Sequence, residues 1–221
     1  MPFILFLLFI ANCFADDDCP CKGRVDIGPA FASIDMLESG HTVRTLELWG
    51  VRADATILIY KGFCIKPAVL IADGKANLNV YSIGAGFCFP ITETITLTPS
   101  GGYSETHYKS RISFPAFGLT HLREKFKSQG GYLAIDGCWT FIPGFRAYAG
   151  FQWAWSTVHT TVRPLFKSKQ HCQGPSYTGC IEYDLLENLS INFAGAYNLS
   201  LSKEKHGLRG KGCKLGLVYW F

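Results

Sequence analysis

The sequence has few charged residues and, past its first fifteen positions, no long apolar run. Asp, Glu, Lys and Arg make up 17% of the 221 residues, against roughly 25% in an ordinary soluble domain. A membrane-spanning helix needs about 20 consecutive apolar residues, and no such stretch follows residue 15. These shortages exclude a protein that crosses a membrane with helices, and the 48% hydrophobic content excludes a disordered chain. A soluble β-rich domain or a closed β-barrel in lipid remains.

Motifs of catalysis and cofactor binding are missing as well. The chain has no Gly-x-Ser-x-Gly turn, no glycine-rich phosphate loop and no nucleophile beside an identifiable base. Cys19-Pro20-Cys21 lacks the Cys-x-x-Cys spacing of a zinc or redox site. We therefore expect a protein that is not an enzyme and that binds no cofactor, no metal and no nucleic acid.

An export signal opens the chain. Pro2 to Ile10 is a short apolar core, and the following Ala11 to Ala15 has small residues at both cleavage positions. This pattern predicts a signal peptide over 1–15 and a short periplasmic segment over 16–23. The four residues that end at Cys13 also resemble a lipoprotein cleavage box, although the Asn before the cysteine fits it poorly.

Two long segments alternate between apolar residues and smaller or polar ones. Phe145 to Thr157 and Leu189 to Leu201 each keep this period of two over thirteen residues, which indicates β-strands. Thirteen residues exceed the roughly five or six of a usual soluble strand but suit a tilted strand that crosses a bilayer and projects beyond it. The same reading predicts ten strands, near 24–34, 43–59, 63–73, 78–90, 94–107, 129–142, 145–162, 178–186, 189–202 and 208–221. The phase slips near Leu46 to Trp49, where we expect a bulge.

The connections differ between the two ends of these strands. The tight ones lie at 60–62, 90–93, 143–144 and 186–188, and the mostly longer, more polar ones at 35–42, 108–128, 163–177 and 203–207. This is the layout of an outer-membrane barrel. The 206 residues that follow a 15-residue signal peptide are too few for a sixteen-strand porin. We expect an all-β transmembrane antiparallel up-and-down β-barrel of ten strands over 24–221, with eight strands as the alternative.

The last strand carries the most specific motif. Leu215, Leu217, Tyr219 and Phe221 share one face, and the sequence stops on this aromatic residue. Here it resembles the bacterial outer-membrane β-barrel family, whose last strand ends in this way. The resemblance implies a location in the bacterial outer membrane and an assembly signal, formed by these four residues, that the barrel-assembly machinery reads. The cysteine content also resembles, in composition alone, the disulfide-rich envelope proteins of chlamydiae.

If the apolar faces meet lipid, the opposite faces line the lumen. They carry five cations and five anions, namely Arg24, Asp26, Arg52, Asp54, Lys66, Asp136, Arg146, Glu182, Asp184 and Lys214. Such ions in a narrow barrel need partners, and equal numbers allow pairing across the lumen. We favour a structural network that fills the barrel. The alternative is a narrow channel for small solutes, with Arg52, Asp54, Lys66, Asp136 and Arg146 at its constriction.

The predicted outer rim is strongly basic. Its twelve cations are Lys109, Arg111, Arg123, Lys125, Lys127, Arg163, Lys167, Lys169, Lys203, Lys205, Arg209 and Lys211. Against Glu105, Glu124 and Glu204 they leave +9, while the whole chain carries only +4. A basic rim attracts lipopolysaccharide phosphates or acidic host glycans. We expect a structural or adhesive surface protein whose partners are outer-membrane lipid and lipopolysaccharide, and then acidic host glycans or other envelope proteins.

A hydrolase at the outer rim is the least favoured reading. Some ten-stranded barrels resemble the omptin proteases, whose acidic and histidine residues lie at this rim. Five histidines lie in or near the predicted outer loops, namely His107, His121, His159, His171 and His206. No paired acidic motif accompanies them.

Cysteines give two testable pairings. Cleavage would remove Cys13 and leave eight of the nine, and an even number in an exported chain favours disulfides. These are Cys19, Cys21, Cys64, Cys88, Cys138, Cys172, Cys180 and Cys213. Cys172 and Cys180 enclose a flexible span able to fold back. Cys64 and Cys88 share the lumen-facing phase of neighbouring strands, and a hairpin centred on residue 76 would place them opposite each other.

Overall fold

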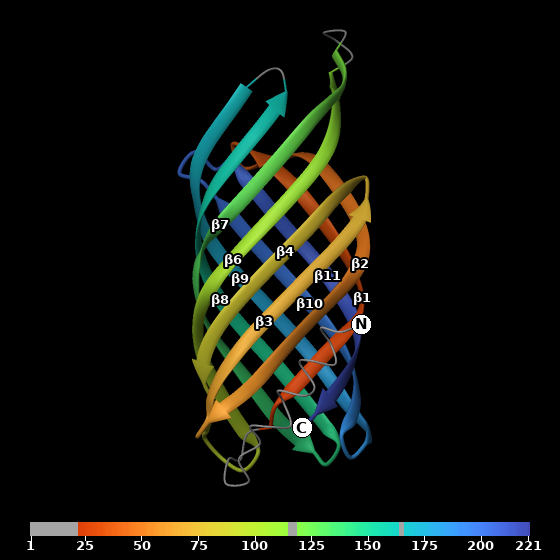
Figure 1. Ribbon diagram of the computed structural model, residues 1–221, viewed down its shortest axis with the longest axis vertical. Coiled ribbons are helices and arrows are strands. Elements are labelled where there is room, and N and C mark those ends of the chain that lie inside the picture. The colour runs from red at the N-terminus through yellow and green to blue at the C-terminus, as the bar shows by residue number, and fades with distance from the viewer. Residues whose placement is uncertain (1–21, 115–118, 164–165) are drawn as a thin grey trace.

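The computed structural model describes residues 22–114, 119–163 and 166–221. These residues form an all-β structure (Figure 1). Its strands are β1 (Arg24–Glu38), β2 (His41–Tyr60), β3 (Phe63–Gly74), β4 (Ala76–Phe87), β5 (Phe89–Pro90), β6 (Ile95–Phe114), β7 (Leu119–Ile142), β8 (Phe145–Arg163), β9 (Phe166–Leu186), β10 (Leu189–Leu201) and β11 (Gly207–Trp220). No helix among the described residues is long and apolar enough to cross a membrane.

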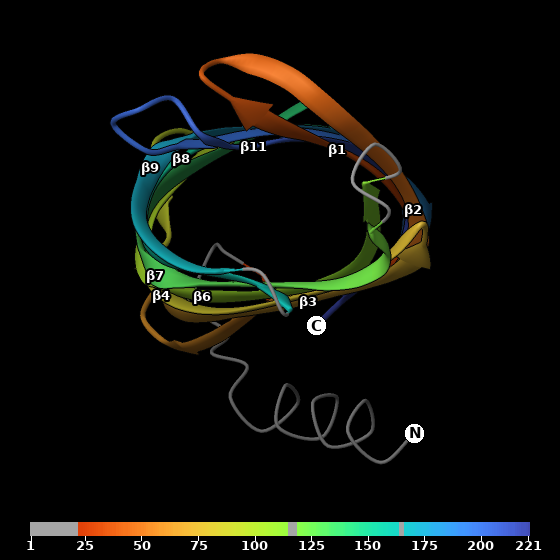
Figure 2. The ribbon, with the colours of Figure 1, turned by 90° about the horizontal axis from the view of Figure 1, so that it is seen from above.

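The strands close into a ring (Figure 2). All pairings are antiparallel, β1 pairs with β11, and β4 pairs with β6. The two-residue β5 continues β4 in the same register against β6, so both belong to one wall segment that is interrupted at Cys88. The result is the predicted closed antiparallel barrel of ten strands, and the eight-strand alternative is wrong.

One rule places the side chains of the whole barrel. Apart from the hairpin tips, even-numbered residues pair with even-numbered residues in every ladder. Successive residues of a strand point to opposite faces, so all even-numbered positions share one face. Asp26 and Glu182 are buried on that face, whereas Trp49 and Leu133 are more than half exposed on the other. Even-numbered residues therefore line the lumen, and odd-numbered residues face outward.

Exposed aromatic residues form two outward groups. The lower group lies beside the short turns and includes Trp139, Phe141, Phe145, Tyr183 and Tyr219. The upper group comprises Trp49, Tyr81, Tyr103, Trp155 and Tyr177; on β8 Trp155 stands ten residues from Phe145, and on β9 Tyr177 stands six residues from Tyr183. Aliphatic side chains, among them Val51 and Leu133, are exposed between the groups. Two outward aromatic groups with an aliphatic zone between them are typical of a barrel wall that spans a bilayer.

The strands on the long-loop side are longer than predicted. The expected loop at 108–128 is mostly strand, because β6 runs to Phe114 and β7 begins at Leu119. The expected loop at 163–177 is likewise strand, since β9 begins at Phe166. Both hairpins rise above the rest of the barrel (Figure 1). The prediction was wrong here because a strand above the membrane faces water, so its outward residues are polar and imitate a loop.

The predicted bulge near Leu46 to Trp49 is absent. β1 and β2 pair in one continuous register there, and the only shift lies between Met36 and Leu37 near the hairpin tip. Leu46 and Leu48 are even-numbered and buried, so they face the lumen in phase with Arg52. The apparent slip marks a change in what lines the lumen, from ions to apolar side chains.

Candidate functional site

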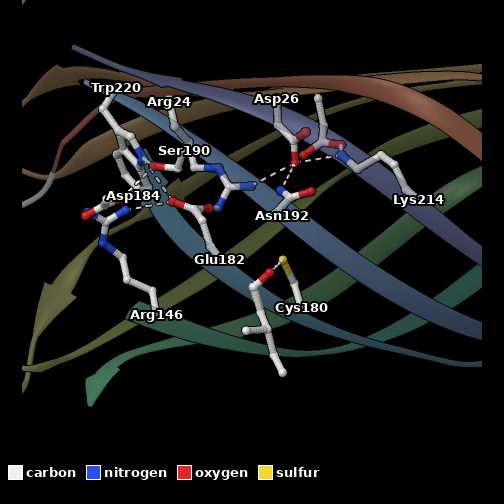
Figure 3. A network of polar contacts seen from close by, with 12 residues as sticks. Arg24, Asp26, Arg146, Cys180, Glu182, Asp184, Ser190, Asn192, Lys214 and Trp220 are labelled. Atoms are coloured by element: carbon white, nitrogen blue, oxygen red, sulfur yellow. Dashed lines mark hydrogen bonds and ion pairs between the residues drawn. The ribbon is translucent and has the colours of Figure 1, made fainter. Parts of the chain in front are cut away.

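A network of ion pairs lies in the lumen near the short turns (Figure 3). At its centre, Glu182 is fully buried. Its Oε1 lies 2.7 Å from Arg146 Nη1, and its Oε2 lies 3.5 Å from Arg24 Nη1. The indole Nε1 of Trp220 donates to the same carboxylate at 2.9 Å, and Arg146 Nη2 also reaches Asp184 Oδ2 at 2.7 Å. A buried carboxylate is costly unless it is paired and hydrogen-bonded, and these groups supply both.

Lys214 forms the second centre, between two aspartates. Its Nζ lies 2.6 Å from Asp26 Oδ2 and 2.9 Å from Asp54 Oδ2. Asn192 Nδ2 donates to Asp26 at 2.6 Å, and Arg24 Nη2 lies 3.1 Å from the same carboxylate. Since Arg24 also contacts the first centre, the two centres form one network.

All ten residues that the sequence proposed for the lumen enter ion pairs. Two further pairs complete the set, Arg52 with Asp54 at 3.2 Å and Lys66 with Asp136. These pairs are more exposed than those around Glu182.

Sequence reasoning missed the uncharged members of the network. Ser190 Oγ donates to Asp184 Oδ1 at 2.6 Å, and Asn192 and Trp220 donate to the carboxylates described above. All three are even-numbered residues of β10 and β11, strands that the alternation had located. Their lumen-facing phase could therefore have identified them.

Gly216 leaves space for the ion-pair network because it has no side chain. A Cβ atom built there would overlap Asp26 Oδ1 and lie 2.6 Å from Asn192 Oδ1. Gly195, on the outward face of β10, has nothing within 4 Å of such an atom. The absent side chain at Gly216 is therefore part of how Asp26 is held.

The half of the lumen nearer the long hairpins is apolar. Its buried cluster consists of Ile34, Leu46, Leu48, Ala72, Ala76, Leu78 and Tyr108, all even-numbered. Above it, Arg44 of β2 crosses the short β3–β4 hairpin to Glu124 of β7, with Nη1 3.7 Å from Oε2. Ser110 Oγ donates to the same oxygen at 2.7 Å. The lumen is thus lined by ion pairs at one end and by apolar side chains at the other.

The outward face of the projecting hairpins is basic. We call the parts of β6 to β9 above the upper aromatic group, residues 105–114, 119–129, 157–163 and 166–173, the projecting sheet. All twelve predicted rim cations are odd-numbered, and eight lie in this sheet. Lys203 and Lys205 lie in the β10–β11 connection, and Arg209 and Lys211 at the start of β11.

The register places these cations beside one another. Lys109 stands opposite Lys125. Lys127 stands opposite His159, which stands opposite Lys169. The backbones of Arg111 and Arg163 both stand opposite Arg123, although the side chains of these two flanking arginines lie outside what the structure describes. Like charges on directly opposed residues repel, so the rows would be stabilised by an added anion.

Two cations of the outer surface already have carboxylate partners. Lys127 Nζ lies 2.6 Å from Glu105 Oε1, and this hydrogen bond holds the pKa of Glu105 below its usual value. Arg209 Nη2 lies 2.7 Å from Asp35 Oδ2. Among the residues that the structure describes, Lys109, Lys125, Lys167 and Lys169 have no ion-pair partner.

The two predicted disulfides are wrong. Cys172 and Cys180 are free thiols of one extended strand, β9, and eight residues of strand separate them by about 26 Å. Cys64 is a free, buried thiol opposite Gly86, because the β3–β4 hairpin is centred on residue 75 and not on 76. Cys88 is disulfide-bonded, but not to Cys64.

Three of the histidines predicted for the outer rim have side-chain partners among the described residues. His107 Nε2 lies 3.0 Å from Glu105, His206 Nε2 lies 3.8 Å from Glu204, and His171 Nδ1 lies 3.3 Å from a threonine hydroxyl. The side chain of His121 lies outside the described residues. Within the described ranges, no three His, Cys, Asp or Glu side chains are grouped so as to hold a metal ion.

Comparison by sequence finds no relative, since neither a protein-family model nor a curated protein matches. Comparison of structures finds outer-membrane proteins. The outer membrane protease OmpT of Escherichia coli has 14% identity and a TM-score of 0.54, covering 91% of this chain and 97% of its own. An outer membrane channel from Pseudomonas putida F1 has 11% identity and a TM-score of 0.52, covering 94% and 100%. The attachment invasion locus protein Ail of Yersinia pestis has 9% identity and a TM-score of 0.45, covering 90% and 98%.

The likenesses to OmpT and to the Pseudomonas putida channel establish the fold alone. With the outward apolar belt, they make the chain a transmembrane β-barrel of the bacterial outer-membrane type. The fold class and the outer-membrane location that the sequence predicted are confirmed.

Proposed function

We propose that the protein is a non-enzymatic surface barrel that works from its outer face. The ion pairs and the apolar cluster inside the lumen join its strands into a scaffold, and the projecting sheet presents cations above the membrane. Its ligands are acidic saccharides, either sulfated glycans of a host surface or the phosphate-bearing core of lipopolysaccharide. The role is adhesive in the first case and structural in the second.

The observation that carries this proposal is the set of cation rows on the projecting sheet. Lys109 stands opposite Lys125. Lys167 and Lys169 extend the basic surface over β9, and neither has a carboxylate partner among the described residues. Adjacent strands are about 4.8 Å apart, and alternate residues of one strand about 6.6 Å apart. A chain of closely spaced sulfates or phosphates can bridge such rows. Contacts of this kind weaken as salt is added.

Binding of the detergent-solubilised barrel to heparin and to lipopolysaccharide tests the proposal. We expect Lys109→Gln/Lys125→Gln to weaken binding and to reduce its salt dependence. The control Lys22→Gln/Lys61→Gln removes the same charge near the short turns and should bind as the unaltered protein does. Equal losses in both variants would mean that net charge alone attracts the polyanion. A preference for heparin would support an adhesive role, and a preference for lipopolysaccharide would support a structural one.

A narrow channel is the second candidate. It is favoured by the greater exposure of the Arg52–Asp54 and Lys66–Asp136 pairs compared with those around Glu182. If the lumen opens, these pairs and Arg146 form its constriction. Conductance in planar bilayers decides between the two candidates.

A further inference from the structure

The longer open edge of the projecting sheet lies on β9. β10 pairs with β9 as far as Gln173, which stands opposite Leu201. β9 continues from there to Phe166 and pairs only with β8, ending opposite Val162. Residues 166–172 therefore have a strand on one side alone. The β8–β9 hairpin rises clear of the β10–β11 connection in Figure 1.

The neighbouring connection does not cover this edge. Its backbone closes on itself, since Ser202 N–H donates to His206 O at 2.8 Å. Gly40 N–H donates to Lys205 O at 2.9 Å, which fastens the connection to the β1–β2 tip. At the other edge of the sheet, β4 pairs with β6 as far as Ser110, so only residues 111–114 of β6 extend beyond their neighbour, against seven residues of β9.

An open antiparallel edge carries unused backbone groups. Every second residue of a strand turns both its N–H and its C=O away from the existing partner, so seven residues offer about three such positions. Extended peptides bind open edges by completing this ladder, and side chains at alternate positions decide which peptide fits.

The side chains of this edge select for acidic residues. Lys167, Lys169 and His171 are exposed on the outward face, while Ser168 and Gln170 are partly buried on the inward face. We propose that residues 166–172 of β9 bind an extended acidic segment of a partner protein as an added antiparallel strand. An acidic residue at every second position of that segment faces Lys167 and Lys169. A second copy of β9 fits poorly, because it would set these cations against one another.

The inference does not rest on saccharide binding, which uses the face of the sheet and needs no backbone ladder. The probe is an acetylated nine-residue peptide of alternating Glu and Thr, used with two N-methylated forms. One form is methylated at every Glu and the other at every Thr. All three peptides carry the same charge, but a strand bound by one edge directs only one of the two sets of N–H groups toward β9.

We expect the full-length barrel in detergent to bind the unmodified peptide and one methylated form, and to bind the other at least tenfold more weakly. Lys167→Gln/Lys169→Gln should also weaken binding, whereas Lys203→Gln/Lys205→Gln, which removes the same charge from the β10–β11 connection, should not. Three results would each overturn the inference: no binding of the unmodified peptide, equal binding of both methylated forms, or dimerisation through β9. Lys109→Gln/Lys125→Gln serves as a separate arm. It should lower heparin binding without changing peptide affinity, so the two proposals can fail independently.

Discussion

The spanning wall and the projecting sheet are made from the same strands but have opposite polarity. In the wall part of β7, outward Leu133 and Ile135 are exposed and apolar, and inward Asp136 is ion-paired. Higher in the same strand, outward Lys125 is exposed and inward Leu122 is buried. The parity of inward and outward positions does not change. What changes is the solvent outside, from lipid, which excludes charge, to water, which favours it.

The largest effect is expected when the ion-pair network inside the spanning wall is disrupted. Glu182→Ala leaves Arg24 and Arg146 buried in the lumen without their shared carboxylate. Removing one partner of a buried pair costs about 3–5 kcal/mol, and we expect a loss of this size in the free energy of unfolding. The loss is measured by unfolding the protein in increasing urea and following the folded band on gels run in the cold. Glu105→Gln, which breaks the exposed pair with Lys127, is the control and should unfold at an unchanged urea concentration.

Two reciprocal substitutions, one in each region, test whether the outward face meets lipid in the wall and water in the projecting sheet. Leu133→Lys places an ammonium against lipid near the middle of the wall, which costs about 2–4 kcal/mol in barrels. Lys125→Leu makes the reverse change eight residues away on the same outward face and should leave the free energy of unfolding unaltered. Equal effects of the two substitutions would mean that Lys125 also lies in the membrane.

A third test uses the two glycines of β10 and β11. In Gly216→Ala the added methyl group meets Asp26 and Asn192, and overpacking of this kind costs about 1–3 kcal/mol. Gly195→Ala adds the same group where nothing lies within 4 Å. We expect urea unfolding to separate the two variants, with only the first destabilised. A tolerated Gly216→Ala would show that the network can rearrange around Asp26.

The smallest effect concerns Asp35, on the outward face four residues above the aromatic Phe31. Thr45 Oγ1 donates to its carboxylate at 2.7 Å and Arg209 Nε at 2.8 Å, and these bonds hold the pKa of Asp35 below its usual value. Because the folded pKa lies below the unfolded one, this stabilisation is complete above the unfolded pKa and is lost as the pH falls through the folded pKa. We expect Thr45→Val to raise the pKa of Asp35 in a carboxyl NMR titration. An unchanged pKa would remove Thr45 from this explanation.

The sequence predicted the wall better than it predicted the projecting sheet. In the wall, lipid keeps odd-numbered positions apolar, so the period of two located strands such as β8 and β10 to within a residue. The same periodicity assigned the lumen ions, because they share the parity of Arg146. Above the membrane the outward positions are polar too, and with Ser168 and Gln170 on the inward face the start of β9 resembled a polar loop.

The pairing of residues between strands was the other feature that the sequence did not predict. A hairpin centre displaced by one residue changes the partner of a cysteine by two, which placed Gly86 opposite Cys64 in the position expected for Cys88. Neither the Arg44 bridge to Glu124 nor the open edge of β9 leaves a local sequence pattern. Both depend on the relative heights of hairpins, which spacing along the chain does not reveal.

Conductance across a planar bilayer tests most directly the central claim that the protein works from its outer face and not through its lumen. Purified barrel reconstituted at low protein density should leave the bilayer silent, because ion pairs join opposite walls of one half of the lumen and a buried apolar cluster occupies the other. A steady open channel in the unaltered protein, with an ion selectivity that changes in Arg52→Ala or Lys66→Ala, would contradict the claim and establish the constriction in its place.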